Sequence, residues 1–288
     1  MPTLFKYALL ACAAVSVTAC EDYERPVQGQ MPLVVEGFIE EGANPVVIVT
    51  HALDLTGDSL NLDACIEKWG RVSIYDGDKR HILSGRINDN YTPSFIFTSN
   101  RLRGEQGHTY RLFIETQTDT VEAVSTITPA PKIARLEAVP SEESDTLFSI
   151  KAYLEGLSPD GYCKFFTRRI GKEKRDYASF LGTFAVSEYN PGSGWTVTRG
   201  ITYHAMDNDG FSHYFRRGEA VNVKVCSLES AVFDFWKVYE RNVSMSNNLM
   251  FSFSENCPTN LRSLGSRGVA PLGYWAAYGA SSRIIELE

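Results

Sequence analysis

The stretch EAVNVKVCSL at residues 219–228 shows most directly which fold class this chain adopts. Val221, Val223 and Val225 alternate with other residues, and a period of two is the pattern of a β-strand that buries one face. In this register Cys226 points to the opposite face of the strand. The stretch therefore predicts a strand that packs its valine face into a core.

Similar strand-like runs fill the first half of the chain. They lie at residues 33–39, 46–50, 71–75, 81–83, 94–98, 109–115 and 121–128. About seven short strands with turn residues between them are typical of an immunoglobulin-like β-sandwich, which we predict for residues 32–128. Two prolines, Pro129 and Pro131, then interrupt the pattern. Because proline lacks a backbone donor and disfavours helix, they mark the predicted domain boundary.

Residues 132–288 are predicted to form a second, β-rich domain. Its strand-like runs lie at residues 146–154, 162–170, 195–203, 219–228, 249–253, 274–278 and 283–287. One segment near 230–245 has helical spacing instead, with apolar residues every three or four positions. These residues are Val232, Phe235, Trp236, Tyr239 and Val243. The predicted fold class is therefore mainly β, an immunoglobulin-like sandwich followed by a β-rich domain with one amphipathic helix.

The start of the chain has the features of a bacterial export signal. Lys6 precedes an apolar run that is too short to span a bilayer. The residues Val17-Thr18-Ala19-Cys20 resemble the lipobox of bacterial lipoproteins. We predict that residues 1–19 are removed, that the Cys20 thiol carries the lipid and that residues 20–31 form a tether. An ordinary secretory signal that contains a cysteine is the alternative.

Acidic residues follow Cys20 directly. Glu21, Asp22 and Glu24 resemble the export signal of surface lipoproteins in Bacteroidota-type bacteria. We therefore expect a lipid-anchored protein on the exterior face of the outer membrane, and a solvated linker is the alternative. Loss of Lys6 with the signal changes the formal net charge from −7 to −8. This charge argues against nucleic acid as a partner.

Motifs of catalysis are missing from the sequence, which contains no GxSxG, HExxH, P-loop or GxGxxG pattern. We predict no enzymatic activity, no cofactor and no metal site. The segment at 207–210 (DNDG), between His204 and His213, resembles part of a calcium loop. However, position 218 is Gly where the last ligand of such a loop belongs. A tight turn is the preferred interpretation.

Two further sets of residues leave alternatives open. The cysteines after Cys20 are either buried thiols or include one bridge in the C-terminal half; they are Cys65, Cys163, Cys226 and Cys257. Ser59, Thr120 and Thr146 each stand between Asp and an apolar residue, which resembles the O-glycosylation acceptors of exported Bacteroidota proteins. Ordinary strand starts are the alternative for these three.

Motifs along nearly the whole mature chain resemble one family. They lie at residues 34–39, 72–77, 107–112, 207–210, 221–225, 235–239, 256–261 and 271–277. Their order is similar to that of the lipoproteins grouped as domain of unknown function 4249, although Cys257 and Leu264 depart from the usual late loop. The resemblance implies an accessory lipoprotein for uptake at the cell surface, beside an outer-membrane TonB-dependent receptor. It assigns no activity to any residue.

The segment at residues 256–273 lies between two strand-like runs and is rich in Asn, Gly and Pro. Long ordered loops in compact domains are usually functional. We therefore predict that Asn256, Asn260, Arg262 and Arg267 contact a protein partner. In the alternative interpretation the Asn side chains only satisfy nearby backbone groups.

Two functions are compatible with these features. The first is a non-enzymatic surface lipoprotein of the outer membrane that assists a TonB-dependent transporter in nutrient uptake. The second is a stand-alone glycan- or peptide-binding lipoprotein that uses aromatic side chains as a platform, with an unknown ligand. The aromatic candidates for that platform are Trp195, Tyr203, Tyr214 and Trp275. In both cases the N-terminal lipid holds the protein on the membrane.

Replacing the lipidated residue tests the predicted anchor. Cys20→Ala should release the protein from the membrane fraction, because no other run in the chain is long and apolar enough to span a bilayer. Fractionation in high salt, followed by immunoblotting, measures this. A variant that stays with the membranes under these conditions contradicts the lipoprotein interpretation.

Overall fold

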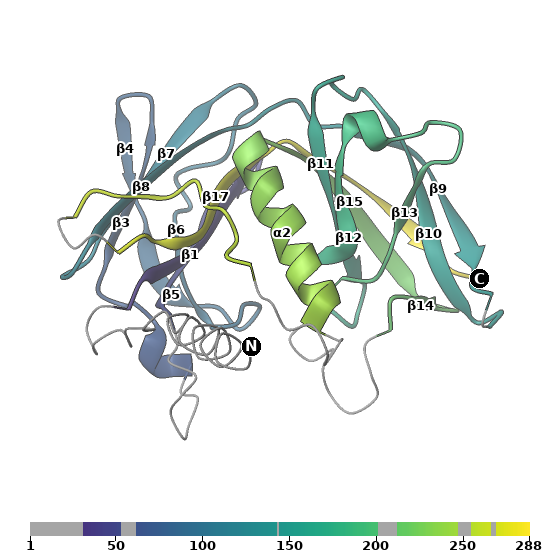
Figure 1. The fold of residues 1–288 in the computed structure, drawn as a ribbon, viewed down its shortest axis with the longest axis horizontal. Coiled ribbons are helices and arrows are strands. Elements are labelled where there is room, and N and C mark those ends of the chain that lie inside the picture. The colour runs from purple at the N-terminus through teal and green to yellow at the C-terminus, as the bar shows by residue number, and fades with distance from the viewer. Residues whose placement is uncertain (1–30, 53–61, 143, 201–211, 247–254, 266–268) are drawn as a thin grey trace, which may run out of the picture. The chain divides into compact units, whose positions relative to one another are not determined.

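A computed structural model describes residues 31–52, 62–142, 144–200, 212–246, 255–265 and 269–288 (Figure 1). These residues form four β-sheets and one α-helix. The predicted fold class, mainly β with sandwich-like layers and one amphipathic helix, is confirmed.

Two five-stranded sheets form the first β-sandwich. Their orders are β17-β1-β2-β6-β5 and β16-β8-β7-β3-β4. The strands are β1 (Leu33–Glu40), β2 (Val46–His51), β3 (Arg71–Asp76), β4 (Lys79–Ile82), β5 (Ser84–Ile87), β6 (Phe95–Thr98), β7 (Thr109–Glu115), β8 (Thr120–Thr126), β16 (Arg262–Ser263) and β17 (Leu272–Tyr278). A short 3-10 helix, η1 (Leu62–Cys65), precedes β3. Alternate residues of each strand enter the first core, for example Val35 and Ile39 of β1.

Two four-stranded sheets form the second β-rich body. One has the order β12-β11-β15-β18, and in the other β13, β14 and β9 all pair with β10. The strands are β9 (Lys132–Pro140), β10 (Leu147–Glu155), β11 (Tyr162–Arg169), β12 (Tyr177–Ala185), β13 (Trp195–Val197), β14 (Phe215–Arg216), β15 (Ala220–Leu228) and β18 (Ala280–Glu286), and the 3-10 helix η2 (Val186–Glu188) follows β12. The register predicted for β15 is confirmed: Val221, Val223 and Val225 enter the second core, and Cys226 lies in a different cluster.

The helix α2 (Ser230–Ser246) lies between the two bodies (Figure 1). A third apolar cluster is built around it. The predicted stripe is correct at Val232, Phe235 and Trp236, which are buried there. Strands of both bodies contribute to the same cluster, such as Tyr278 of β17 and Cys226 of β15. The helix therefore joins the two bodies through apolar packing.

A buried ion pair fastens α2 to the sheet below it. Lys164 of β11 is fully buried and donates to the carboxylate of Glu240 on α2 and to the backbone oxygen of Ser179 at 3.0 Å. The Thr183 backbone N–H and hydroxyl donate to the same carboxylate at 3.0 and 2.6 Å. Burial lowers the pKa of Lys164, and the charge of Glu240 opposes that shift. Since the partners are satisfied, the pair specifies how the helix docks.

The end of the chain returns to the first sandwich. β17 pairs with β1 in parallel, from Val34 opposite Leu272 to Glu40 opposite Tyr278, and β16 pairs with β8. The predicted division placed all of residues 132–288 in a second domain, whereas these two strands belong to the sheets of the first. The physical reason is the alternation of β17: Trp275 and Ala277 fill the first core, which residues 32–128 leave open.

Two glycines allow the close approach of β1 and β17. A Cβ on Gly37 of β1 would lie 2.9 Å from the Trp275 ring, and one on Gly273 of β17 would lie 2.0 Å from the Val35 carbonyl oxygen. Gly273 also has a φ of +96°, which side-chain-bearing residues rarely adopt. The Trp275 indole N–H then donates to the Tyr110 carbonyl at 3.0 Å and ties the strand to the opposite sheet.

Gly273→Ala should destabilise the protein by about 3 kcal/mol or more, because both the backbone conformation and the contact with Val35 oppose a Cβ. Gly107→Ala is the matched control. Its φ is +83° but its Cβ would meet open space, so we expect a loss of about 1 kcal/mol. Denaturant unfolding measures both, and equal losses would show that the approach of the two strands does not restrict position 273.

Candidate functional site

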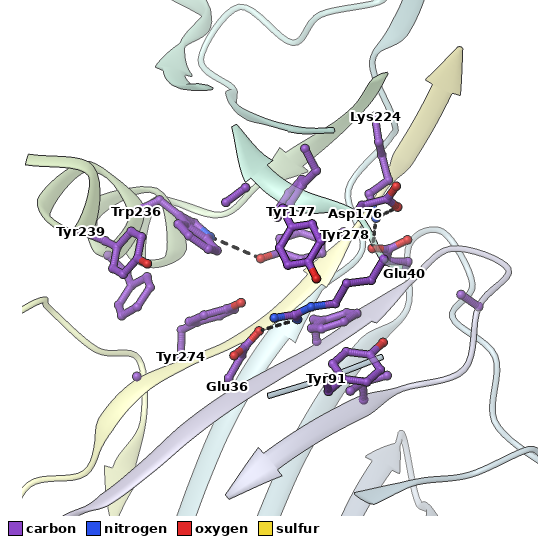
Figure 2. Close-up of a pocket in the computed structure, with 18 of the residues that line it drawn as sticks. Glu36, Glu40, Tyr91, Asp176, Tyr177, Lys224, Trp236, Tyr239, Tyr274 and Tyr278 are labelled. Atoms are coloured by element: carbon purple, nitrogen blue, oxygen red, sulfur yellow. Dashed lines mark hydrogen bonds and ion pairs between the residues drawn. The ribbon is translucent and has the colours of Figure 1, made fainter. Parts of the chain in front are cut away.

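A cavity of about 540 Å³ lies between the two bodies, beside α2 (Figure 2). Its walls come from β1 and β17 of the first sandwich, from β11 and β15 of the second body, and from the loop between β11 and β12. Alternation explains the β1 wall: odd-numbered residues enter the first core, while Glu36, Phe38 and Glu40 face the cavity. The cavity therefore lies between the facing sides of two sheets, in the space that α2 does not fill.

Aromatic side chains make much of the lining. Figure 2 shows Trp236 and Tyr239 on α2, Tyr274 on β17, and Tyr91 and Tyr177 nearer the charged groups. The Trp236 ring centroid lies 5.4 Å from that of Tyr239 and 5.3 Å from that of Tyr274. Burial raises the pKa of Tyr91, Tyr239 and Tyr274. These phenols therefore stay protonated and present hydroxyl groups together with flat apolar faces.

One group of charges in the cavity forms ion pairs within itself, although the buried Arg168 Nε has no hydrogen-bond partner among the described residues. The Lys224 ammonium lies 2.5 Å from a Glu40 carboxylate oxygen and 3.0 Å from an Asp176 oxygen. Asp176 also accepts from the Asn222 side chain at 3.1 Å and faces the Arg168 guanidinium at 3.4 Å. Burial alone would lower the pKa of Lys224, but the Glu40 and Asp176 carboxylates outweigh it and raise the pKa. Lys224 is therefore a fixed cation whose partners are in place.

Arg175 is held differently. Its guanidinium lies over the rings of Tyr91 at 4.9 Å and Tyr177 at 5.1 Å, which is cation–π geometry. Its hydrogen bond to Glu36 is long, at 3.4 Å, and its buried Nε has no hydrogen-bond partner among the described residues. Burial opposes the charge, and Glu36 and the phenols raise the pKa above its usual value. Arg175 is therefore a charged group whose Nε donor is not used by any described residue.

The lining offers recognition chemistry. The described lining residues comprise aromatic rings, phenol hydroxyls, carboxylates and cations, and they include no His, Cys, Ser or Thr. Among the residues that the structure describes, no cluster of His, Cys, Asp or Glu has the arrangement of a metal site. Flat faces combined with oriented donors and acceptors bind and position a small organic ligand.

Several predicted site residues fall outside the described part of the chain. These are Cys20, Glu21, Asp22, Glu24, Ser59 and Arg267, together with the turn at 207–210, His204 and the strand-like run at 249–253. Within the described helices, none is long and apolar enough to cross a membrane. Thr120 begins β8, and its backbone N–H donates to Asp119 at 2.7 Å, while Thr146 directly precedes β10. Both threonines thus lie at strand starts.

The segment at residues 256–273, called the late segment from here on, has a structural role in its described part. The Asn260 amide donates to the Trp275 carbonyl at 2.7 Å and accepts from the Trp275 N–H at 3.0 Å, so it replaces a neighbouring strand. Arg262 forms an ion pair with Glu122 and keeps 72% of its side chain exposed, and Asn256 is exposed. None of these residues lines the cavity.

The predicted aromatic platform is wrong at Trp275, which is fully buried in the first core. Trp195 stacks on Phe184 at 4.3 Å and packs against the second core. Tyr203 lies outside the described residues, and Tyr214, which is half-buried, does not line the cavity. Tryptophans in strands are often core residues, and β-strand register decides which face they take.

Three of the cysteines are free thiols, namely Cys163, Cys226 and Cys257. No bridge therefore joins these three, which favours buried thiols over a disulfide in the C-terminal half. Burial raises the pKa of Cys163 to about 12 and that of Cys226 well above its usual value. Cys163 lies in the second core and Cys226 in the cluster between the bodies, so the two thiols point to opposite faces of one sheet.

The cavity residues were not predicted from the sequence, although the sequence contains a signal for them. Glu36 and Glu40 interrupt an apolar strand at positions of one face, as Lys224 does in β15. Charged residues on a strand face that is otherwise apolar indicate a site or an ion pair, since unpaired burial is costly.

Asn260→Ala should lower the free energy of unfolding by about 2 kcal/mol, because it leaves two backbone groups of a buried strand unpaired. The matched control is Asn256→Ala, at an exposed position in the same segment, which should change stability by less than about 0.5 kcal/mol. Thermal or urea unfolding tests the pair. An unchanged Asn260→Ala protein would return this residue to the partner-contact hypothesis.

Comparison with known proteins adds one finding. A search of curated proteins finds no match to the chain. The family model described as Domain of unknown function (DUF4249) matches residues 21–284. That range contains the helix α2, all residues of the cavity and the described strands. The end of β18 alone, among these strands, lies outside it. With this match over nearly its whole length, the chain belongs to the DUF4249 family.

Proposed function

We propose that the protein is a non-enzymatic lipoprotein of the outer-membrane surface that captures a small ligand in the cavity and assists a TonB-dependent transporter in nutrient uptake. The observation that carries the proposal is the aromatic and charged cavity between the two bodies. The lipobox at Cys20 and the acidic residues after it support the location. The family resemblance supports the transporter as a partner.

The cavity has the properties of a ligand site. Its volume of about 540 Å³ lies within the range of small-molecule pockets, which occur preferentially where two bodies meet. Its walls are held by packing of α2 and by the buried pair of Lys164 and Glu240. A preformed site of this kind loses little conformational entropy on binding. The geometry therefore supports binding better than any reaction.

The surface that faces the transporter is proposed to be the late segment. Its exposed residues include Asn256, Arg262 and Leu264. These residues do not line the cavity. Asn260 contributes to this surface only indirectly, by holding the segment against Trp275.

Charge reversal tests the docking surface. Arg262→Glu combined with Arg267→Glu should reduce co-purification with the neighbouring transporter by at least about tenfold, since exposed arginines are common interface anchors. Folding should be little affected, because 72% of the Arg262 side chain is exposed and an ion pair of such a residue contributes at most about 1 kcal/mol. Arg283→Glu, at an exposed position of β18, is the matched reversal on the second body.

Co-purification of these variants and of the wild-type protein distinguishes the possible outcomes. Capture that falls for the double variant and not for Arg283→Glu supports the late segment as the contact. Normal capture by a normally folded double variant removes the segment from the proposal, and recovery of the wild-type protein as a clean monomer in gentle detergent removes the transporter.

The second candidate function is a stand-alone glycan- or peptide-binding lipoprotein. The cavity favours it as well, because aromatic faces beside hydroxyl and carboxylate groups also suit such ligands. Ligand binding that persists in cells lacking the transporter, with no loss of uptake, would decide for this alternative.

A further inference from the structure

We infer that the cavity recognises a ligand through a carboxylate group, which the guanidinium of Arg175 receives beside the aromatic wall. The inference rests on the proposed binding function and names the class of ligand: a monocarboxylate whose body is a ring or a similarly flat apolar group.

Arg175 has donor capacity that the described residues do not use. A guanidinium has five N–H donors in one plane. Among the described residues, Arg175 has a long hydrogen bond to Glu36 at 3.4 Å and a hydrogen bond to the Tyr177 side chain, and its buried Nε has no partner. Arg169, on the strand β11 just before the same loop, shows the contrast: its Nε donates to Glu173 at 2.7 Å and its Nη1 to Glu219 at 3.4 Å. A planar carboxylate matches the unused fork of Arg175 with two parallel hydrogen bonds.

The charges of the described lining residues do not balance. It contains four cations, Arg168, Lys174, Arg175 and Lys224, and three carboxylates, Glu36, Glu40 and Asp176. Four positive and three negative charges leave one positive charge, which a monoanion neutralises.

The position of the unmatched charge follows from the ion pairs. Lys224 and Arg168 share Glu40 and Asp176. The ion pair of Arg175 within the described part of the chain is its long contact with Glu36. Lys174 is exposed at the edge of the cavity and forms no ion pair with a described residue. Counted by ion pairs, the unmatched charge is that of Lys174, the neighbour of Arg175 on the loop between β11 and β12.

Aromatic side chains form the wall around Arg175. The rings of Tyr91 and Tyr177 lie 4.9 and 5.1 Å from the Arg175 guanidinium carbon. Tyr239 and Tyr274 line the same cavity close to Trp236. A ligand that places its carboxylate on Arg175 can therefore lay a ring against these faces. Since 24% of the Arg175 side chain is exposed, the group is reachable from solvent.

Two sources can supply this chemistry, an aromatic acid or an acid sugar, and the experiment separates them. Full-length protein in detergent is titrated calorimetrically with phenylacetate and with glucuronate, and each is matched by a neutral analogue, phenylacetamide and glucose. For fragments of this size we expect a Kd of about 1 mM for the acid that fits. The matched neutral compound should bind at least about tenfold more weakly, because it lacks the charge-assisted pair.

Variants give changes of opposite sign, which loss of folding does not imitate. Arg175→Gln should weaken binding of the acid by at least about tenfold. Glu36→Gln should tighten it about threefold or more, because it removes the carboxylate that competes for Arg175. Arg135→Gln is the control, since Arg135 has the same local chemistry away from the cavity, 3.7 Å from the Tyr153 ring and 2.8 Å from Glu137.

Three results overturn the inference: neutral analogues that bind as tightly as the acids, an Arg175→Gln protein that binds them unchanged, or no binding of either acid at about 10 mM. The first two leave the cavity a binding site for another class of ligand, so the proposed function stands. Failure of the proposed function is measured in a separate experiment, the co-purification of the protein with the transporter.

Discussion

The parallel pairing of β17 with β1 is the contact on which the rest of the structure depends. It joins residues near the two ends of the described chain, with Glu36 opposite Tyr274 and Phe38 opposite Ala276. Because side chains alternate along a strand, Trp275 and Ala277 complete the first core while Tyr274 and Tyr278 enter the cluster between the bodies. The strand β17 therefore contributes to both the first core and the cluster between the bodies, and neither is complete without it.

The cavity is a consequence of this pairing. β1 contributes Glu36 and Glu40, β17 contributes Tyr274 and Tyr278, and the opposite wall comes from β11, β15 and α2. The buried contact of Lys164 with Glu240 keeps the helix on its sheet, since an unpaired charge at either position would be costly. Packing and one satisfied ion pair thus hold open a space that the side chains do not fill.

The charges of the cavity differ in how far they are satisfied. Lys224 lies between two carboxylates at short distance, so its burial is compensated. Arg175 is held mainly by aromatic faces and by one long contact with Glu36. Charged groups that are ordered but incompletely paired are typical of binding sites, because a ligand can supply the missing partner. This difference separates the structural ion pairs from the group that is available for recognition.

Local pattern determined much of the secondary structure. The alternation at 219–228 and the helical spacing near 230–245 are determined by side chains within a few residues, so β15 and α2 could be predicted from the sequence. Two long strands, β9 and β12, escaped prediction. β9 begins directly after Pro131, where the prolines indicated a break, and β12 alternates weakly because both of its faces are partly buried.

Tertiary structure alone decided the site. Nothing in the sequence near Trp275 shows that its strand pairs with β1, because that pairing depends on a backbone approach that only Gly37 and Gly273 permit. The same holds for Tyr91, Arg175 and Tyr239, which come from a loop, another loop and a helix. Sequence by itself determined the fold class, the helix, the family resemblance and the expected lipid anchor. The cavity required long-range contacts, whose partners are set by the packing of whole sheets and not by neighbouring residues.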